Sequence, residues 1–315
     1  MQHLDALRQV YQVQPIAIPC RPERRRELEA EGYIVAADLK EAVNNWNVSH
    51  CVVATNTSRH VRDSLAAMES GLDTLVEKPM GIDASEAKRL CAEARRVDRK
   101  VYVGCVLRFS ESLKTFRAWL NRIEPVHSVR IECQTYLPDW RPARGYRDVY
   151  SARVEEGGVL RDLVHEIDYA GWLFGWPATI QARVRSLGRL GIEADEEADL
   201  MWEAADASLV TVRLDYLSRP PRRQMRACGK GGTVEWDGIA NRVVLALATK
   251  PAEIFVSTQT RQDMMRAQAK AFIHDGHATE VGQLATCVEG AKALAICDAA
   301  RRATKSTHME SVDYE

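Results

Sequence analysis

The sequence lacks several features that would place a chain of 315 residues in a class at once. Its apolar runs stay well short of the ~18 residues that a membrane-spanning helix needs. The formal net charge of -1 disfavours binding to nucleic acid or an anionic membrane through a global field. The glycine patterns GxGxxG and GxxxxGK(S/T) are both absent, because "GKGGT" at 229–233 has the wrong spacing for a phosphate loop.

Cysteine occurs eight times, but never as a CxxC pair or at the spacing of a zinc site. Cys51 and Cys105 lie inside apolar runs, where cysteine behaves as a small hydrophobe. We therefore expect reduced thiols, no bound metal and a cytoplasmic location. The segment "HDGH" at 274–277 has no further metal ligands nearby, which favours a surface turn over a metal site.

What is present is an alternation of short apolar runs and helical segments over the first hundred residues. The runs are at 15–18, 50–55, 73–77 and 100–107. Short continuous apolar strands separated by helices predict a parallel sheet covered on both faces. We expect two domains, a Rossmann-type α/β domain at 1–106 and a second domain at 107–315, and we expect Ser58 to cap the helix after the second run.

Ligands of parallel sheets bind outside the carboxyl ends of the strands, so the loops there are the candidate site. Pro79 restricts Lys78 to an extended backbone, which aims the lysine side chain. Small polar residues after the second run can approach a phosphate at a helix N-terminus. The alternative is that these residues form an ordinary protein surface, because strands often end in charged residues there. The candidate cofactor contacts in these two loops are Thr55, Asn56, Thr57, His60, Glu77, Lys78 and Pro79.

Longer runs in the second half are interrupted by one helical segment. The runs at 127–137, 179–187, 208–217 and 233–236 predict an α+β domain with a large, open, mostly antiparallel sheet. The segment at 157–175 predicts one helix, on which Asp162 and His165 are neighbours. The alternative is a surface pair without a catalytic role.

Four segments together resemble the glucose–fructose oxidoreductase/inositol dehydrogenase (Gfo/Idh/MocA) family. They are "VVATNTSRH", "TLVEKPM", "GGVLRDLVHEIDYAGWLFG" and "EGAKALAICDAARRA", and the likeness covers nearly the whole chain in a consistent order. The stretch at 136–153 also resembles a bacterial subgroup associated with sugar and nucleotide-sugar metabolism.

The resemblance implies NAD(P)-dependent hydride transfer at a hydroxyl or ketone of a sugar, nucleotide sugar or cyclitol. It implies catalytic roles for Lys78, Asp162 and His165, although the family commonly spaces this aspartate four residues before the histidine, and here the interval is three. Histidine suits the base that removes the hydroxyl proton, and Lys78 can stabilise the negative charge that develops. Candidate substrate contacts, each with a structural alternative, are Arg108, Trp140, Arg141, Arg147 and Tyr169.

Arg21 follows the first apolar run, where an NAD-preferring fold usually has an acidic residue, so the sequence favours NADP over NAD. The alternative is that Arg21 belongs to the exposed basic start of a helix and does not bind a phosphate. We also expect a homodimer or homotetramer, because a large uncovered apolar sheet face usually needs a partner.

A dinucleotide-binding domain normally opens with a strand and a glycine loop, whereas this chain opens on a helix with Leu4, Leu7 and Tyr11 on its apolar side. We therefore expect a chain whose central strand is missing at the N-terminus, or a natural truncation with impaired cofactor binding. A form extended upstream by about ten to fifteen residues, enough for a strand of ~5–6 residues and a loop, should melt higher and bind NAD(P) more tightly. The rival function is a non-catalytic dinucleotide-binding or scaffold protein of the same fold.

Overall fold

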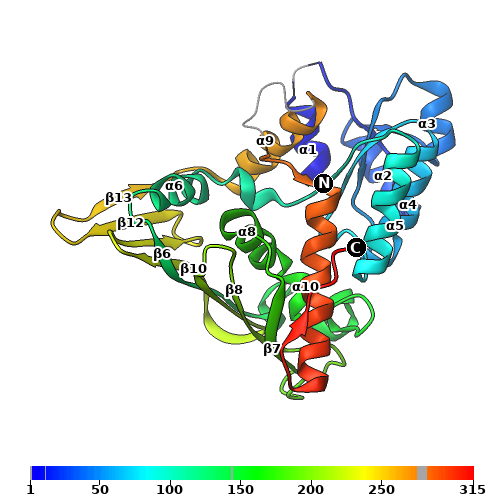
Figure 1. The fold of residues 1–315 in the computed structure, drawn as a ribbon. Coiled ribbons are helices and arrows are strands. Elements are labelled where there is room, and N and C mark those ends of the chain that lie inside the picture. The colour runs from blue at the N-terminus through cyan, green and yellow to red at the C-terminus, as the bar shows by residue number, and fades with distance from the viewer. Residues whose placement is uncertain (1, 11, 143–144, 275–281) are drawn as a thin grey trace.

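The computed structural model describes residues 2–10, 12–142, 145–274 and 282–315. Its N-terminal region alternates strands and helices as predicted (Figure 1). The elements are α1 (Gln2–Arg8), β1 (Ile16–Ala17), α2 (Glu23–Ala30), β2 (Ile34–Val35), α3 (Leu39–Asn45), β3 (His50–Val53), α4 (Thr57–Glu69), β4 (Asp73–Val76), α5 (Ala84–Arg96) and β5 (Val101–Val103). All four predicted strands are present, and β2, a strand of two residues, was not predicted.

The N-terminal strands form two separate sheets. β3, β4 and β5 pair in parallel, which confirms the predicted parallel sheet, while β1 and β2 pair only with each other. In the part of the chain that the structure describes, no strand joins β1 to β3. The interruption lies where the missing central strand was expected, and the incomplete-domain hypothesis stays a prediction. Tyr11, expected on the first helix, lies outside the described residues.

Side-chain caps explain where the helices of this region begin. Asp83 accepts a hydrogen bond from the backbone N–H of Glu86 and so caps α5. Leu90 is fully buried on the face of α5 that packs into the core, which stabilises the fold by roughly 1.5–3 kcal/mol. The helix after β3 starts at Thr57, and Asn56 occupies its N-cap position without a capping side-chain hydrogen bond, so the prediction of Ser58 as the cap is wrong.

The C-terminal region contains a nine-stranded sheet in the order β13-β12-β11-β10-β6-β9-β8-β7-β15. Only β6 and β9 pair in parallel, which confirms the mostly antiparallel sheet. The strands are β6 (Val126–Tyr136), β7 (Thr179–Arg185), β8 (Glu197–Glu203), β9 (Leu209–Asp215), β10 (Leu217–Gly229), β11 (Gly232–Asp237), β12 (Arg242–Leu247), β13 (Glu253–Val256) and β15 (Glu310–Ser311). The helices are η1 (Val106–Phe109), α6 (Glu111–Leu120), η2 (Leu137–Asp139), η3 (Tyr146–Asp148), η4 (Tyr150–Ala152), α7 (Val159–Asp162), α8 (Val164–Phe174), α9 (Arg261–Ile273) and α10 (Cys287–Ser306).

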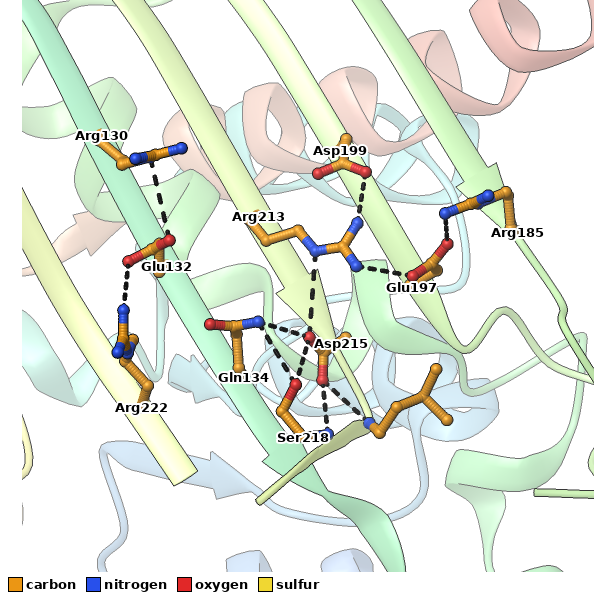
Figure 2. A network of polar contacts seen from close by, with 11 residues as sticks. Arg130, Glu132, Gln134, Arg185, Glu197, Asp199, Arg213, Asp215, Ser218 and Arg222 are labelled. Carbon is orange, nitrogen blue, oxygen red and sulfur yellow. Dashed lines mark hydrogen bonds and ion pairs between the residues drawn. The ribbon is translucent and has the colours of Figure 1, made fainter. Parts of the chain in front are cut away.

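The two faces of this sheet differ in chemistry. Val210, Val212 and Leu214 of β9 are buried in the core. The opposite face carries a ladder of charges, in which Arg213 contacts carboxylates of β8 and lies near Asp215, while the helices lie behind the sheet in the view of Figure 2. The predicted uncovered apolar face is therefore wrong here, since alternation along the strands puts arginine and carboxylate side chains on the open side.

The chain returns to the N-terminal sheet near its end. β14 (Ala285–Thr286) pairs with β5, and α10 then packs against both α5 and β7. The chain thus crosses the predicted boundary at residue 106 a second time, and the division into two domains stays a prediction. Of the segment "HDGH", His274 ends α9, and residues 275–277 lie outside the described residues.

A disulfide joins Cys91 of α5 to Cys287 of α10, with the two Cα atoms 5.7 Å apart. The expectation of reduced thiols is wrong for this pair. The two cysteines are 196 residues apart in the sequence, so their spacing does not indicate that they pair. Among the helices of the described residues, none is long and apolar enough to cross a bilayer.

Candidate active site

Lys78 reaches from the loop after β4 to a break between two helices. Its Nζ donates a hydrogen bond to the backbone carbonyl of Asp162 at 2.7 Å. That carbonyl is available because the helix is interrupted at Leu163, and the N–H of Glu166 bonds to Leu163 instead. The prediction of one continuous helix is thus corrected to two helices, and the break supplies the acceptor that holds Lys78.

Asp162 lies beside the tyrosines Tyr216 and Tyr150. The hydroxyl of Tyr216 donates to Oδ2 of Asp162 at 2.6 Å, while Oδ1 is buried and has no hydrogen-bond partner among the described residues. Burial and then the charge of Asp162 raise the pKa of Tyr150 to about 12. Trp140 packs edge-on against Tyr216, and Arg141 lies 5.7 Å from the ring of Tyr150. The structure thus brings Trp140 and Arg141 to the surroundings of Asp162, as a role in substrate binding requires.

His165 is buried, with 7% of its surface exposed, and faces several positive charges. Burial, and then the charges of Lys78, Arg223 and Arg261, lower its pKa well below the ordinary value for histidine. Its Nδ1 has no hydrogen-bond partner within the described ranges. At neutral pH the imidazole is therefore neutral, which is the form that accepts a proton.

A Gly-Gly turn places these helices against the rest of the domain. Gly158 has a φ of 91°, and a Cβ there would lie 2.5 Å from Oδ1 of Asp195. The same carboxylate accepts a hydrogen bond from the N–H of Leu160, at 3.2 Å. A substitution at Gly158 would therefore strain the backbone and push Asp195 away from the start of α7.

His60 links the two predicted cofactor loops. It is 2% exposed, and its ring nitrogens bond to the carbonyl oxygens of Pro79 (2.7 Å) and Thr55 (3.0 Å). The loops after β3 and β4 are therefore side by side, as their positions predicted. His60 holds them together from beneath and presents no ring nitrogen to a cofactor. Asn56 is exposed at the N-cap of α4, and Thr57 beside it is buried.

Glu77 is engaged by a residue that the sequence did not implicate. Oε1 of Glu77 lies 2.6 Å from Nε2 of His3 on α1, and Oε2 accepts from the backbone N–H of Lys78. Burial favours the neutral carboxyl, but the contacts to His3 and Lys78 outweigh it and lower the pKa of Glu77. The first turn of α1 therefore lies beside the candidate cofactor loops, which only the tertiary structure reveals.

Arg21 lies exposed in the turn after β1, at the position that the sequence predicted. Arg147 donates from Nε to the carbonyl of Leu190 at 3.0 Å, which gives it a structural role in this loop. Both positions are on the surface, so neither is a core residue.

Arg108 and Tyr169 are not available to a substrate, so their prediction as substrate contacts is corrected. Arg108 is fully buried and bonds to both oxygens of Asp168 (3.0 and 2.7 Å) and to Glu289 (2.8 Å). Tyr169 is also fully buried and packs edge-on against Trp236. Arg108 comes from η1, Asp168 from α8 and Glu289 from α10, so this ion-pair network joins three elements of the fold.

Comparison with family models decides the family. Residues 2–105 match the model described as oxidoreductase family, NAD-binding Rossmann fold, and residues 120–235 match the GFO/IDH/MocA C-terminal domain. The chain belongs to the Gfo/Idh/MocA family. Together the two matched ranges cover more than half of its length, in the order that the resemblance predicted.

Relatives and solved structures agree with this family. Inositol 2-dehydrogenase of Streptomyces avermitilis is 27% identical over 223 residues, covering 68% of this chain and 61% of the relative. The NADP(+)-dependent scyllo-inositol 2-dehydrogenase of Bacillus subtilis is 27% identical over 191 residues, covering 58% and 49%. The chain therefore matches about half to three-fifths of the length of these relatives.

Among solved structures, levoglucosan dehydrogenase in complex with NADH and levoglucosan superposes with a TM-score of 0.86 at 15% identity, covering 99% of this chain and 94% of that chain. The WlbA dehydrogenase from Bordetella pertussis, in complex with NADH and UDP-GlcNAcA, gives a TM-score of 0.81 at 17% identity, with the same coverage. At these identities the superpositions establish the fold alone.

Proposed function

We propose that this protein is an NAD(P)-dependent oxidoreductase that transfers a hydride between a nicotinamide cofactor and a hydroxyl or ketone of a sugar, nucleotide sugar or cyclitol. The observation that carries the proposal is the convergence of Lys78, Asp162 and His165 from two separate regions of the fold. The relatives named above act on inositols by name, and the family model describes an NAD-binding fold.

The loops after β3 and β4 suit a nicotinamide cofactor. They lie at the carboxyl ends of parallel strands, where such cofactors bind, and Oγ1 of Thr55 is buried there with no hydrogen-bond partner among the described residues. When bound, the cofactor would accept or donate the hydride. Thr55, Asn56 and Pro79 would hold it beside Lys78.

The chain's own residues would handle the proton. His165, neutral at pH 7, takes the hydroxyl proton as the carbinol is oxidised and returns it in the reverse direction. Lys78 stabilises the negative charge on the substrate oxygen, because its Nζ uses one donor on the carbonyl of Asp162 and retains others. Asp162 binds a substrate hydroxyl through Oδ1, while Tyr216 fixes the other carboxylate oxygen.

The proposal also covers the choice between NAD and NADP and the oligomeric state. NADP is favoured by Arg21, which is exposed after β1 and free of any ion pair in the described part of the chain. For a homodimer or homotetramer, the contact surface proposed is the open face of the nine-stranded sheet, where arginines and carboxylates alternate (Figure 2). Size-exclusion chromatography with light scattering tests the second point.

The experiment that tests the function is a turnover screen. Purified protein is incubated with NAD or NADP and a panel of cyclitols, sugars and nucleotide sugars, and reduced nicotinamide is followed by absorbance. We expect turnover with at least one class of polyol and its loss in the His165→Ala variant. Cofactor binding without turnover across the whole panel would favour the non-catalytic dinucleotide-binding or scaffold protein instead.

A further inference from the structure

The three acidic side chains of residues 162–168, the segment that contains His165, are each tied to a different element. Asp162 accepts from Tyr216 at 2.6 Å, just beyond β9. Glu166 pairs with Arg223 of β10 at 2.8 Å. Asp168 pairs with Arg108 of η1. The segment is therefore anchored on both sides of the histidine, whose own Nδ1 has no partner within the described ranges.

The Glu166–Arg223 pair is the tether that lies next to His165 in the chain. Glu166 is fully buried, and a quarter of the Arg223 side chain is exposed. Arg223 occupies the face of β10 that packs on the helices, because Met225 and Ala227 on the same face are buried. Arg226, on the other face of the strand, is exposed. Apolar residues of similar volume commonly stabilise a core as well as a buried ion pair does, so fold stability alone does not explain this pair.

We propose that the Arg223–Glu166 ion pair is a positioning unit for His165: it anchors the first turn of α8 to β10 and sets the balance of charge around the imidazole. This inference rests on the proposed function, because it assigns the pair a task in the same hydride transfer. Neither residue is assigned to contact the substrate.

Charged groups face His165 from each element packed around it. The groups that act on the imidazole are Lys78 from the loop after β4, Arg223 from β10 and Arg261 from α9. The carboxylates of the same segment are Asp162 of α7 and Glu166 of α8, which is next to His165 in the chain and pairs with Arg223. Arginine keeps its charge at any pH of interest, so Arg223 always opposes a proton on the ring. Glu166 carries the opposite charge and lies 2.8 Å from Nε of Arg223. Removal of either charge leaves the other uncompensated, and the two changes must therefore act in opposite directions.

The experiment is a pH titration of the unliganded protein, with histidine labelled for NMR and His165 assigned by its absence in His165→Asn. Arg223→Met should raise the protonation midpoint of His165 by about one pH unit, and Glu166→Gln should lower it by a similar amount. The matched control is Arg226→Met, which removes a charge from the same strand on the opposite face, where it pairs with Glu235 at 3.2 Å. The control should leave the midpoint unchanged.

Failure of Arg223→Met to fold does not end the test. The midpoint of Glu166→Gln is then compared with that of the double variant Glu166→Gln/Arg223→Met, in which no charge is left buried alone. The second substitution should raise the midpoint by about one pH unit on that background. Midpoints that do not move, or that move in the same direction in both single variants, overturn the proposal.

Steady-state kinetics distinguish this inference from the proposed function. In an active protein, Arg223→Lys should retain most of kcat, and the acid limb of kcat/KM should follow the NMR midpoint in every variant. If the His165 midpoint moves in opposite directions in Arg223→Met and Glu166→Gln but no substrate is turned over, the proposed function is contradicted and the effect of the ion pair on His165 is supported. Turnover with unchanged midpoints would contradict the positioning role of the Arg223–Glu166 pair and would leave the proposed oxidoreductase function supported.

Discussion

The smallest and the largest sheet among the described residues differ in how long their strands are and how many neighbours support them. β1 and β2 have two residues each and pair only with each other, whereas β10 has 13 residues and lies inside a nine-stranded sheet. An isolated pair of strands is marginally stable, while a long ladder with one buried face supports itself. The N-terminal region therefore depends more on its attachment to the rest of the molecule than the C-terminal region does.

That attachment is made at a few places. Arg108 fixes η1, the turn that directly follows β5 of the N-terminal sheet, to α8 and α10 through Asp168 and Glu289. The Cys91–Cys287 disulfide joins α5 to α10. Because Lys78 comes from the N-terminal region and His165 from the C-terminal region, the same attachments also hold the two halves of the candidate active site together.

The largest effect is expected at the buried network. Arg108→Ala should lower the free energy of unfolding by about 3–5 kcal/mol, because it leaves Asp168 buried without its partner. The exposed pair of Arg122 and Glu253 is the control, and Arg122→Ala should leave the melting temperature within error. Equal losses in the two variants, measured by denaturant unfolding, would show that the buried network stabilises the fold no more than an exposed ion pair does.

Next come the two catalytic candidates, one from each region. Lys78→Ala and His165→Ala should each lower kcat by about 10²-fold or more, the usual contribution of a general acid–base or charge-stabilising group. Only Lys78→Ala should weaken cofactor binding, since Lys78 lies in the cofactor loop. Fluorescence titration separates the two outcomes, and wild-type kcat in both variants would remove these residues from the mechanism.

A smaller effect should follow from reducing the disulfide. Cys91→Ser should lower the free energy of unfolding by about 2–4 kcal/mol. Hydrogen exchange should then accelerate in β3 to β5 and remain unchanged in β9, if the N-terminal region is the weaker one. Cys228→Ser serves as the control, because Cys228 is a free cysteine. Uniform acceleration in both sheets would contradict the comparison between the regions.

The smallest effect concerns the 2′-phosphate that distinguishes NADP from NAD. Arg21→Ala should weaken NADP by roughly tenfold and leave NAD nearly unchanged, because only NADP offers a phosphate for a charge-assisted hydrogen bond. Fluorescence titration with both cofactors measures the ratio. An equal loss for NAD and NADP would withdraw the preference for NADP.

The sequence alone determined the elements whose signal is local. Short apolar runs identified β3, β4 and β5, and the placement of Lys78 at a strand end followed from the same pattern. It missed β10, where the pair Pro220 and Pro221 interrupts the strand pattern, although a bulge there accommodates both prolines. Hydrophobic period and turn residues act over a few positions, so a single sequence reports them directly.

Only the tertiary structure decided which polar residues face the site. Arg108 and Tyr169 carry the same polar groups as Arg141 and Tyr150, yet the first two lie in the core and the last two lie beside Asp162. The break at Leu163, which frees the carbonyl that holds Lys78, has no local marker either. Such features depend on partners that are distant in the chain, as with Cys91 and Cys287, and burial by those partners is not encoded in any short stretch of residues.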